Sequence, residues 1–200
     1  GIRKTIIGTV AAKIAEQADI PVLLIPGKYD WKDPTHLVFA SNYSKSDKDA
    51  LHTLLSIARL FKSRVTVLHL RNTYLSAVEK EKAQADFDAY AFALQRDFNE
   101  DKIKFSLLDT DSVTETMENL DKKMPYDIIG MVRRKKGFYE KFFIGSFTKN
   151  MAYITKQPLL IIPEQTTANG KNKKYGKEET LLMPHKSKLK IEKLSKKKQL

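Results

Sequence analysis

An internal repeat constrains the fold of this 200-residue chain more than any other feature of its sequence. Residues 7–26 read IGTVAAKIAEQADIPVLLIP and residues 144–163 read IGSFTKNMAYITKQPLLIIP, and the two align without a gap. Each has a glycine and a hydroxyl residue, then a segment of helix length, then an apolar run between two prolines. Similarity at a fixed offset indicates a repeated structural unit. We therefore predict that residues 7–26 are the last helix and strand of one repeat and that a complete second repeat follows.

Between the two copies, apolar runs of strand length alternate with segments of helical periodicity. The runs typical of strands are 37–41, 65–70, 103–108, 127–132 and 159–162. The segments typical of helices are 46–61, 76–98 and 112–123, and one more helix is expected after Gly145-Ser146. Such alternation favours parallel strands joined by right-handed crossovers. The prediction is a doubly wound, Rossmann-like α/β fold, with a mostly parallel five-stranded sheet and helices on both faces.

Two of the expected helices begin with a capping signal. Ser46 can cap the first helix of the second repeat with its hydroxyl group. Ser112 and Glu115 have the spacing of a capping box, in which each side chain bonds the other residue's backbone amide.

The composition excludes several classes of protein. Hydrophobic residues make up 42% of the chain and charged residues 30%, which is typical of a soluble chain with a packed core. No apolar run approaches the roughly 18 residues of a membrane span. The start, Gly-Ile-Arg-Lys, has no initiator methionine and no secretory segment, so we expect a cytoplasmic chain that begins within a longer protein. The absence of cysteine excludes disulfides, thiolate metal sites and cysteine nucleophiles.

The net charge of +12 is concentrated at the C-terminal end. Residues 165–200 hold 11 lysines and three glutamates, so the rest of the chain is only mildly basic. This tail either keeps the chain in solution or binds an anionic partner, for which Leu189, Ile191 and Leu194 could form one face of a cationic helix.

The repeat, with its order and spacing, resembles the universal stress protein family. That family has a loop of form Gly-x2-Gly-x9-Gly-(Ser/Thr) after its fourth strand, then a helix and a last strand between prolines. Gly145-Ser146 and residues 157–163 are similar to that ending, and Gly8-Thr9 and residues 20–26 are similar to it in the preceding copy. The resemblance covers about residues 1–163 and implies the C-terminal part of a tandem two-domain member.

This resemblance divides the chain into four parts. Residues 1–26 are the helix and strand that end a preceding domain, and 27–36 are a linker. Residues 37–163 are a complete universal stress protein domain, and 164–200 are a basic tail that we expect to be disordered.

The resemblance also implies an adenine-nucleotide site with altered residues. In nucleotide-binding members, backbone amides of the glycine loop hold phosphates at a helix N-terminus. Gly145 and Ser146 keep the end of that loop, but its two earlier glycines fall on Val132 and Lys135. The acidic residue that helps to hold adenine and ribose falls on Asn42. ATP binding by this half of the protein is therefore expected to be weak or lost.

Two features leave that expectation open. The basic run Arg133-Arg134-Lys135-Lys136 can supply cations to phosphates in place of the glycines, or it is a solvated loop at a decayed site. Gly8 and Thr9 are the equivalents of Gly145 and Ser146 in the preceding copy, whose other loop positions lie before residue 1.

No set of residues favours catalysis or a resident metal. The histidines at positions 36, 52, 69 and 185 lack the spacing of a metal site. Asp109 and Asp111 follow a strand, where turns and helix capping explain them, and Asp127 opens a strand at the other end of the sheet. There is no Walker motif and no nucleophile elbow. The aromatic residues Phe138, Tyr139, Phe142 and Phe143 could form a partner surface, or Phe142 and Phe143 pack on the sheet.

We therefore expect a non-catalytic, nucleotide-sensitive domain of the stress response. Its last strands, at residues 22–25 and 159–162, would pair in an internal pseudo-dimer or in a homodimer. The alternatives are a cytosolic regulatory domain of a membrane transporter, a partner-binding module without nucleotide, and a nucleic-acid-binding protein that uses its basic tail.

Overall fold

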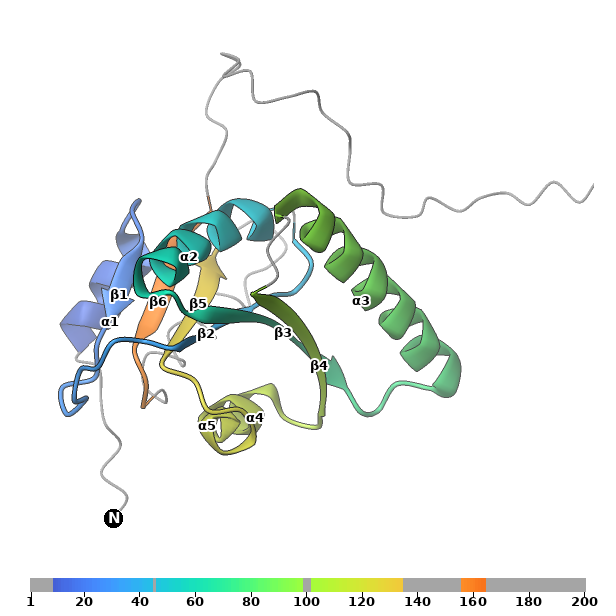
Figure 1. The fold of residues 1–200 in the computed structure, drawn as a ribbon. Coiled ribbons are helices and arrows are strands. Elements are labelled where there is room, and N and C mark those ends of the chain that lie inside the picture. The colour runs from blue at the N-terminus through green and yellow to red at the C-terminus, as the bar shows by residue number, and fades with distance from the viewer. Residues whose placement is uncertain (1–8, 45, 99–101, 135–155, 165–200) are drawn as a thin grey trace, which may run out of the picture. The chain divides into compact units, whose positions relative to one another are not determined.

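The structure is a computed structural model that describes residues 9–44, 46–98, 102–134 and 156–164. All of these residues lie within one compact unit, which spans residues 1–167. They form a mostly parallel sheet with helices on both faces, as the sequence predicted (Figure 1).

The sheet has six strands in the order β1-β6-β5-β2-β3-β4. The strands are β1 (Val22–Leu24), β2 (His36–Ala40), β3 (Arg64–Asn72), β4 (Ile103–Thr110), β5 (Ile128–Arg133) and β6 (Leu159–Pro163). The five predicted strands of the second repeat are all present, within two residues of their predicted bounds. A sixth strand is added because β1, from the first copy of the repeat, pairs antiparallel with β6.

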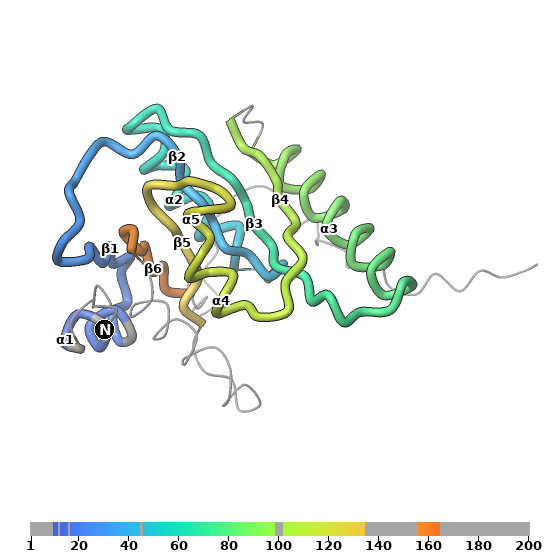
Figure 2. The backbone as a smooth tube through the Cα atoms, turned by 90° about the horizontal axis from the view of Figure 1, so that it is seen from below, coloured from blue at the N-terminus to red at the C-terminus, as the bar shows by residue number. Residues whose placement is uncertain are grey.

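The described helices are α1 (Thr9–Gln17), α2 (Asp47–Phe61), α3 (Ala77–Phe98), α4 (Val113–Glu118) and α5 (Leu120–Lys123). In Figure 1, α2 lies on one side of the sheet, and α4 and α5 lie on the other. Both views place α3 at the β4 end of the sheet, opposite the end that carries α1 and β1 (Figure 2). The helix expected after Gly145-Ser146 lies outside the described residues.

Two predictions about helix ends need correction. The segment 112–123 is two short helices, because the backbone of Asn119 leaves the helical region at φ −112° and ψ 12°. Ser46 occupies the N-cap position of α2 but makes no capping hydrogen bond with its side chain. Its own backbone is already helical, at φ −73° and ψ −13°, whereas a capping residue is normally extended. At α4 the Ser112 hydroxyl does accept a hydrogen bond from the Glu115 amide, at 3.3 Å.

The core has two layers, one on each face of the sheet. Leu37 and Phe39 of β2 pack against α2 and α3, whereas Val38, between them, faces the layer that contains α1, α4 and α5. This alternation follows from the period of two of a strand, and burial of each such side chain is worth about 2 kcal/mol. Gly130 allows close packing at the centre, because a Cβ atom there would lie 2.8 Å from Cδ1 of Leu54.

The order of the strands fixes where a ligand can bind. From β2 the chain proceeds outward to β3 and β4, and then returns to place β5 and β6 on the other side of β2. In doubly wound sheets, ligands bind outside the carboxyl ends of the strands where the order reverses. Here that point lies between β2 and β5.

The pairing of β1 with β6 is symmetric with respect to the repeat. Leu23 lies opposite Leu160, which is its own equivalent in the second copy. Val22 lies opposite Ile161, and Leu24 lies opposite Leu159, so each pair consists of a residue and the equivalent of its neighbour two positions away. The two copies of the last strand are therefore related by a local two-fold axis between Leu23 and Leu160.

Candidate functional site

Two segments that are far apart in the sequence meet at the carboxyl ends of β2 and β5. Asn42 follows β2, and Arg134 follows β5. The guanidinium group of Arg134 donates a hydrogen bond to Oδ1 of Asn42. Asn42, which the sequence singled out, is exposed and lies at the point where the strand order reverses.

The loop between β2 and α2 is organised by the carboxylate of Asp47. This residue is only 1% exposed, and its Oδ2 accepts hydrogen bonds from the Ser41 hydroxyl at 2.6 Å and from the Tyr90 hydroxyl at 3.4 Å. The backbone amides of Asn42 and Ser44 also donate to Oδ2, each at 3.3 Å. Asp47 is the first residue of α2, where the helix dipole stabilises a negative charge. It fixes the position of Asn42 by holding the loop amides.

Tyr43 holds the same loop against β3 and α3 through its aromatic ring. It has a φ of 63°, which is a strained conformation for a residue with a large side chain. Its ring stacks on His69 of β3 with ring centroids 4.0 Å apart, and it lies 4.9 Å from the ring of Tyr90 of α3. Its hydroxyl is buried without a hydrogen-bond partner among the described residues, and burial raises its pKa. The strain is offset by this aromatic packing.

His69 is held as a neutral ring at this position. Its Nδ1 lies 2.9 Å from the carbonyl oxygen of Ser41, which can only accept, so Nδ1 carries the proton. Burial lowers the pKa of His69. The ring is therefore a packing surface for Tyr43 and a donor to the β2 end.

The two residues that end β5 face different surroundings. Val132, at the position of the first loop glycine, is partly buried and packs against the core layer that contains α2. Arg133 points the other way and donates a hydrogen bond to the carbonyl of Ala18, directly after α1. Its Nε is buried without a hydrogen-bond partner among the described residues.

Several predicted residues lie outside the described part of the chain. These are Gly8, Lys135, Lys136, Gly145 and Ser146, together with the aromatic group at positions 138, 139, 142 and 143 and the basic tail. Thr9 is described only as the first residue of α1. The phosphate loop expected from the family resemblance therefore stays a prediction.

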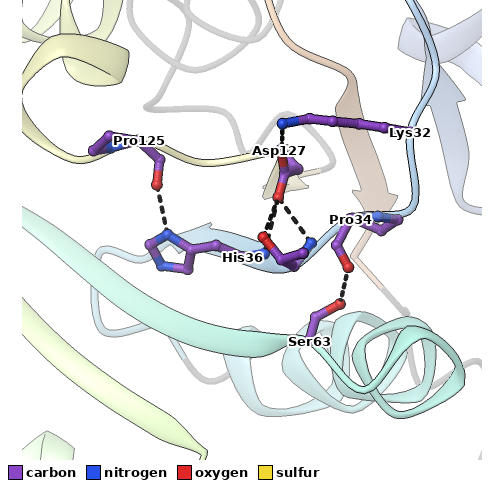
Figure 3. Close-up of polar contacts among 7 residues, drawn as sticks. Lys32, Pro34, His36, Ser63, Pro125 and Asp127 are labelled. Atoms are coloured by element: carbon purple, nitrogen blue, oxygen red, sulfur yellow. Dashed lines mark hydrogen bonds and ion pairs between the residues drawn. The ribbon is translucent and has the colours of Figure 1, made fainter.

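The amino ends of β2 and β5 carry a second polar cluster (Figure 3). Oδ2 of Asp127 accepts hydrogen bonds from the amide of Thr35 at 2.8 Å, the hydroxyl of Thr35 at 3.0 Å and the amide of His36 at 3.0 Å. Its Oδ1 lies 2.9 Å from Nζ of Lys32. Although burial alone would raise the pKa of Asp127, the ion pair and these hydrogen bonds lower it to about 2. Asp127 therefore ties the linker and the start of β2 to the start of β5.

His36 and Ser63 complete this cluster. His36 donates from Nδ1 to the carbonyl of Pro125 at 2.6 Å, and its Nε2 lies 2.8 Å from the hydroxyl of Thr66. Burial lowers the pKa of His36, which favours the neutral ring. The hydroxyl of Ser63 donates to the carbonyl of Pro34 at 2.5 Å. His36 is the first residue of β2, whereas the sequence predicted it to be the last residue of the linker.

The other titratable residues considered in the sequence have structural partners. Asp109 forms a two-bond pair with Arg71, at 2.6 and 3.1 Å, and Asp111 accepts a hydrogen bond from Thr73. The ring of His52 packs on Phe98. Within the described ranges, no three His, Cys, Asp or Glu side chains are placed to hold a metal ion. No helix in those ranges is long and apolar enough to cross a membrane.

Comparison with known proteins gives one family and a set of solved structures. A family model described as the universal stress protein family matches residues 35–163. A protein of unknown function from Pseudomonas aeruginosa, PA1789, is 14% identical with a TM-score of 0.60, and the match covers 82% of this chain and 59% of that protein. A universal stress protein from Archaeoglobus fulgidus is 16% identical with a TM-score of 0.52, covering 64% of this chain and 98% of that one.

A third solved structure is a universal stress protein in complex with cAMP. It is 12% identical with a TM-score of 0.50, and the match covers 66% of this chain and 98% of that protein. No curated protein sequence matches the chain.

Proposed function

The chain belongs to the universal stress protein family, and we propose that it is a non-catalytic, nucleotide-sensitive module of the stress response. The observation that carries the proposal is the meeting of Asn42 and Arg134 at the point where the strand order reverses. There, a polar residue and a cation meet at the carboxyl ends of the strands, where α/β folds bind ligands. A structurally similar universal stress protein is known in complex with cAMP, which supports a nucleotide as the ligand class.

The second part of the proposal is that this half of the protein binds ATP weakly. Val132 stands where the family has a glycine, and its partly buried side chain packs against the core layer that contains α2. Asn42 replaces an acidic residue, and its amide oxygen is already engaged by Arg134. A nucleotide must therefore displace this contact and bind without the close backbone approach that glycine allows.

Isothermal calorimetry with ATP and with inorganic triphosphate, each at two salt concentrations, tests this proposal. We expect weak binding of ATP that falls steeply with salt, because cations contribute more than a shaped loop does. The double variant Val132→Gly, Lys135→Gly should raise the affinity for ATP. Tight, adenine-selective, salt-resistant binding that disappears in Ser146→Ala and Asn42→Ala would contradict weak binding. A complete lack of ATP binding, in the chain and in the double glycine variant, would contradict the nucleotide-sensitive function itself.

We further propose that the chain assembles as a tandem pseudo-dimer. The symmetric register of β1 and β6 supports this arrangement, because a two-fold axis relates the two copies of the strand. Ile25 is 49% exposed whereas its equivalent Ile162 is 3% exposed, so the first copy lacks the cover that the second has. A neighbouring strand equivalent to β5, from a preceding domain, would provide it. The match to PA1789 covers 82% of this chain, more than the family domain alone, and PA1789 is the longer protein.

The variant Leu24→Lys tests the assembly. Leu24 is 5% exposed and lies opposite Leu159, so a lysine there would bury a charge without a partner. Hydrogen exchange should then be faster in β1 and β6 and unchanged in β3 and β4. Lys13→Glu, at an exposed position of α1, is the matched control. Unchanged exchange in the Leu24→Lys variant would contradict the assembly.

A further inference from the structure

Two adjacent arginines at the end of β5 engage opposite sides of the sheet. Side chains alternate along a strand, and Met131 and Val132 already belong to different core layers. Arg133 therefore follows Met131 toward the layer of α1, whereas Arg134 follows Val132 toward the layer of α2. Their observed partners agree with this, since Arg133 bonds Ala18 after α1 and Arg134 bonds Asn42 before α2.

The contact of Arg133 is of a kind that holds two elements together. The carbonyls at the carboxyl end of a helix have no partner within the helix, and the helix dipole makes that end negative. The partly buried side chain of Arg133 donates to the Ala18 carbonyl and so satisfies one of those carbonyls. Ala18 and Arg133 are 115 positions apart, so the bond attaches the first copy of the repeat to the complete domain.

The contact of Arg134 is of a kind that a ligand can replace. Its partner is the neutral amide of Asn42, and the bond between them is exposed to solvent. A guanidinium–phosphate pair brings two opposite charges together and is frequently bidentate, whereas the Asn42 amide is a neutral acceptor with a single oxygen. A phosphate beside Arg134 would therefore gain more from this residue than the lost bond to Asn42 costs.

We propose that the two arginines have separate roles, in which Arg134 is the anion-binding residue for the phosphates of a nucleotide and Arg133 is a positioning residue that fastens the first repeat copy. The ligand class rests on the proposed nucleotide function, whereas the role of Arg133 does not. Asn42 then acts as the resting partner of Arg134 when no phosphate is bound. It follows that phosphate-bearing ligands are favoured over the free nucleoside, which has no anion to exchange for the Asn42 bond.

The matched variants Arg133→Gln and Arg134→Gln test the division on the full chain. Inorganic triphosphate, ATP and adenosine are titrated by calorimetry at low salt. Arg134→Gln should weaken binding of triphosphate and of ATP about tenfold, since a charge-assisted bond is lost. Arg133→Gln should change these affinities less than about twofold. Hydrogen exchange of the β1 amides should become about tenfold faster in Arg133→Gln and should not change in Arg134→Gln. The conservative variant Arg133→Lys should keep most of the protection of the unchanged chain.

The possible outcomes separate this inference from the proposed function. If both variants lose triphosphate binding equally, or if Arg134→Gln frees β1, the division of roles is wrong although nucleotide binding stands. If the unchanged chain binds no triphosphate, Arg134 is not an anion-binding residue. If exchange of β1 is the same in Arg133→Gln as in the unchanged chain, Arg133 does not fasten the first copy, whatever the result with nucleotides.

Discussion

The cluster of Asp127, His36 and Ser63 at the amino ends of β2 and β5 is more completely hydrogen-bonded than the residues at the carboxyl ends of the same strands. At the amino end, the buried groups of Asp127, His36 and Ser63 are joined to backbone and hydroxyl partners at 2.5 to 3.0 Å. At the carboxyl end, the Tyr43 hydroxyl and the Arg133 Nε are buried without hydrogen-bond partners among the described residues. Tyr43 also has a positive φ there.

This difference indicates which end of β2 and β5 stabilises the domain and which end is available to a ligand. A fully paired buried cluster stabilises one arrangement of the chain, because removal of any partner leaves a desolvated polar group. Strained and partly paired groups persist where the surroundings hold them, and they are concentrated at functional sites. The amino end therefore fastens β2 to β5, and the carboxyl end of the same two strands is where we place the proposed ligand.

The largest expected effect is at Asp127. The variant Asp127→Ala removes the acceptor of the Thr35 and His36 amides and leaves both without their partner. We expect the free energy of unfolding in urea to fall by about 3 kcal/mol. The control, Asp109→Ala, breaks an exposed ion pair and should have little effect. An equal loss of unfolding free energy in the two variants would contradict the expectation that the buried carboxylate stabilises the domain more than the exposed one.

The free energy of unfolding should depend on pH because of the same carboxylate, that of Asp127. The pKa of Asp127 is lowered from 3.8 to about 2, so the unfolded chain binds its proton more readily than the folded chain does. The contribution, about 2 kcal/mol, is complete above the unfolded pKa and is lost as the pH falls through about 2. Urea unfolding between about pH 5 and pH 2 should show this loss in the unchanged chain. In Asp127→Asn the slope should be smaller, and an identical slope would contradict the assignment.

Removal of one side-chain oxygen at each end should have opposite effects on the free energy of unfolding. Ser63→Ala, at the amino end, loses the bond to Pro34 and should lower the free energy of unfolding by about 1 kcal/mol. Tyr43→Phe, at the carboxyl end, removes a buried hydroxyl without a described partner and should raise it by up to about 1 kcal/mol. Urea unfolding of both variants measures the difference. If Tyr43→Phe destabilises as Ser63→Ala does, the carboxyl end is paired as fully as the amino end.

The sequence predicted the sheet because its strands are short apolar runs with clear polar boundaries. The family resemblance also implied that β1 and β6 lie side by side, which the pairing of Leu23 with Leu160 confirms. Local patterns were less reliable at helix ends, since Asn119 splits one predicted helix and Ser46 does not cap another.

The polar contacts at the carboxyl end could not be predicted from local sequence patterns, because their partners are far apart in the chain. Asp47 binds Tyr90, which is 43 positions away, and Arg133 binds Ala18 across 115 positions. The first turn of α2 could have suggested Asp47, because acidic residues favour helix N-termini. Nothing in the sequence around Tyr43 predicts its positive φ, which depends on the rings of His69 and Tyr90.

Backbone amide chemical shifts on addition of ATP test most directly the claim that the two ends have separate roles. We expect shifts that grow with ATP concentration at the amides of Asn42, Ser44 and Arg134, at the carboxyl ends of β2 and β5. The amides of Thr35, His36 and Asp127 should stay unchanged, because that cluster only holds the strands together. Shifts that are centred on the amino end, or no shift at the carboxyl end at saturating ATP, would contradict it.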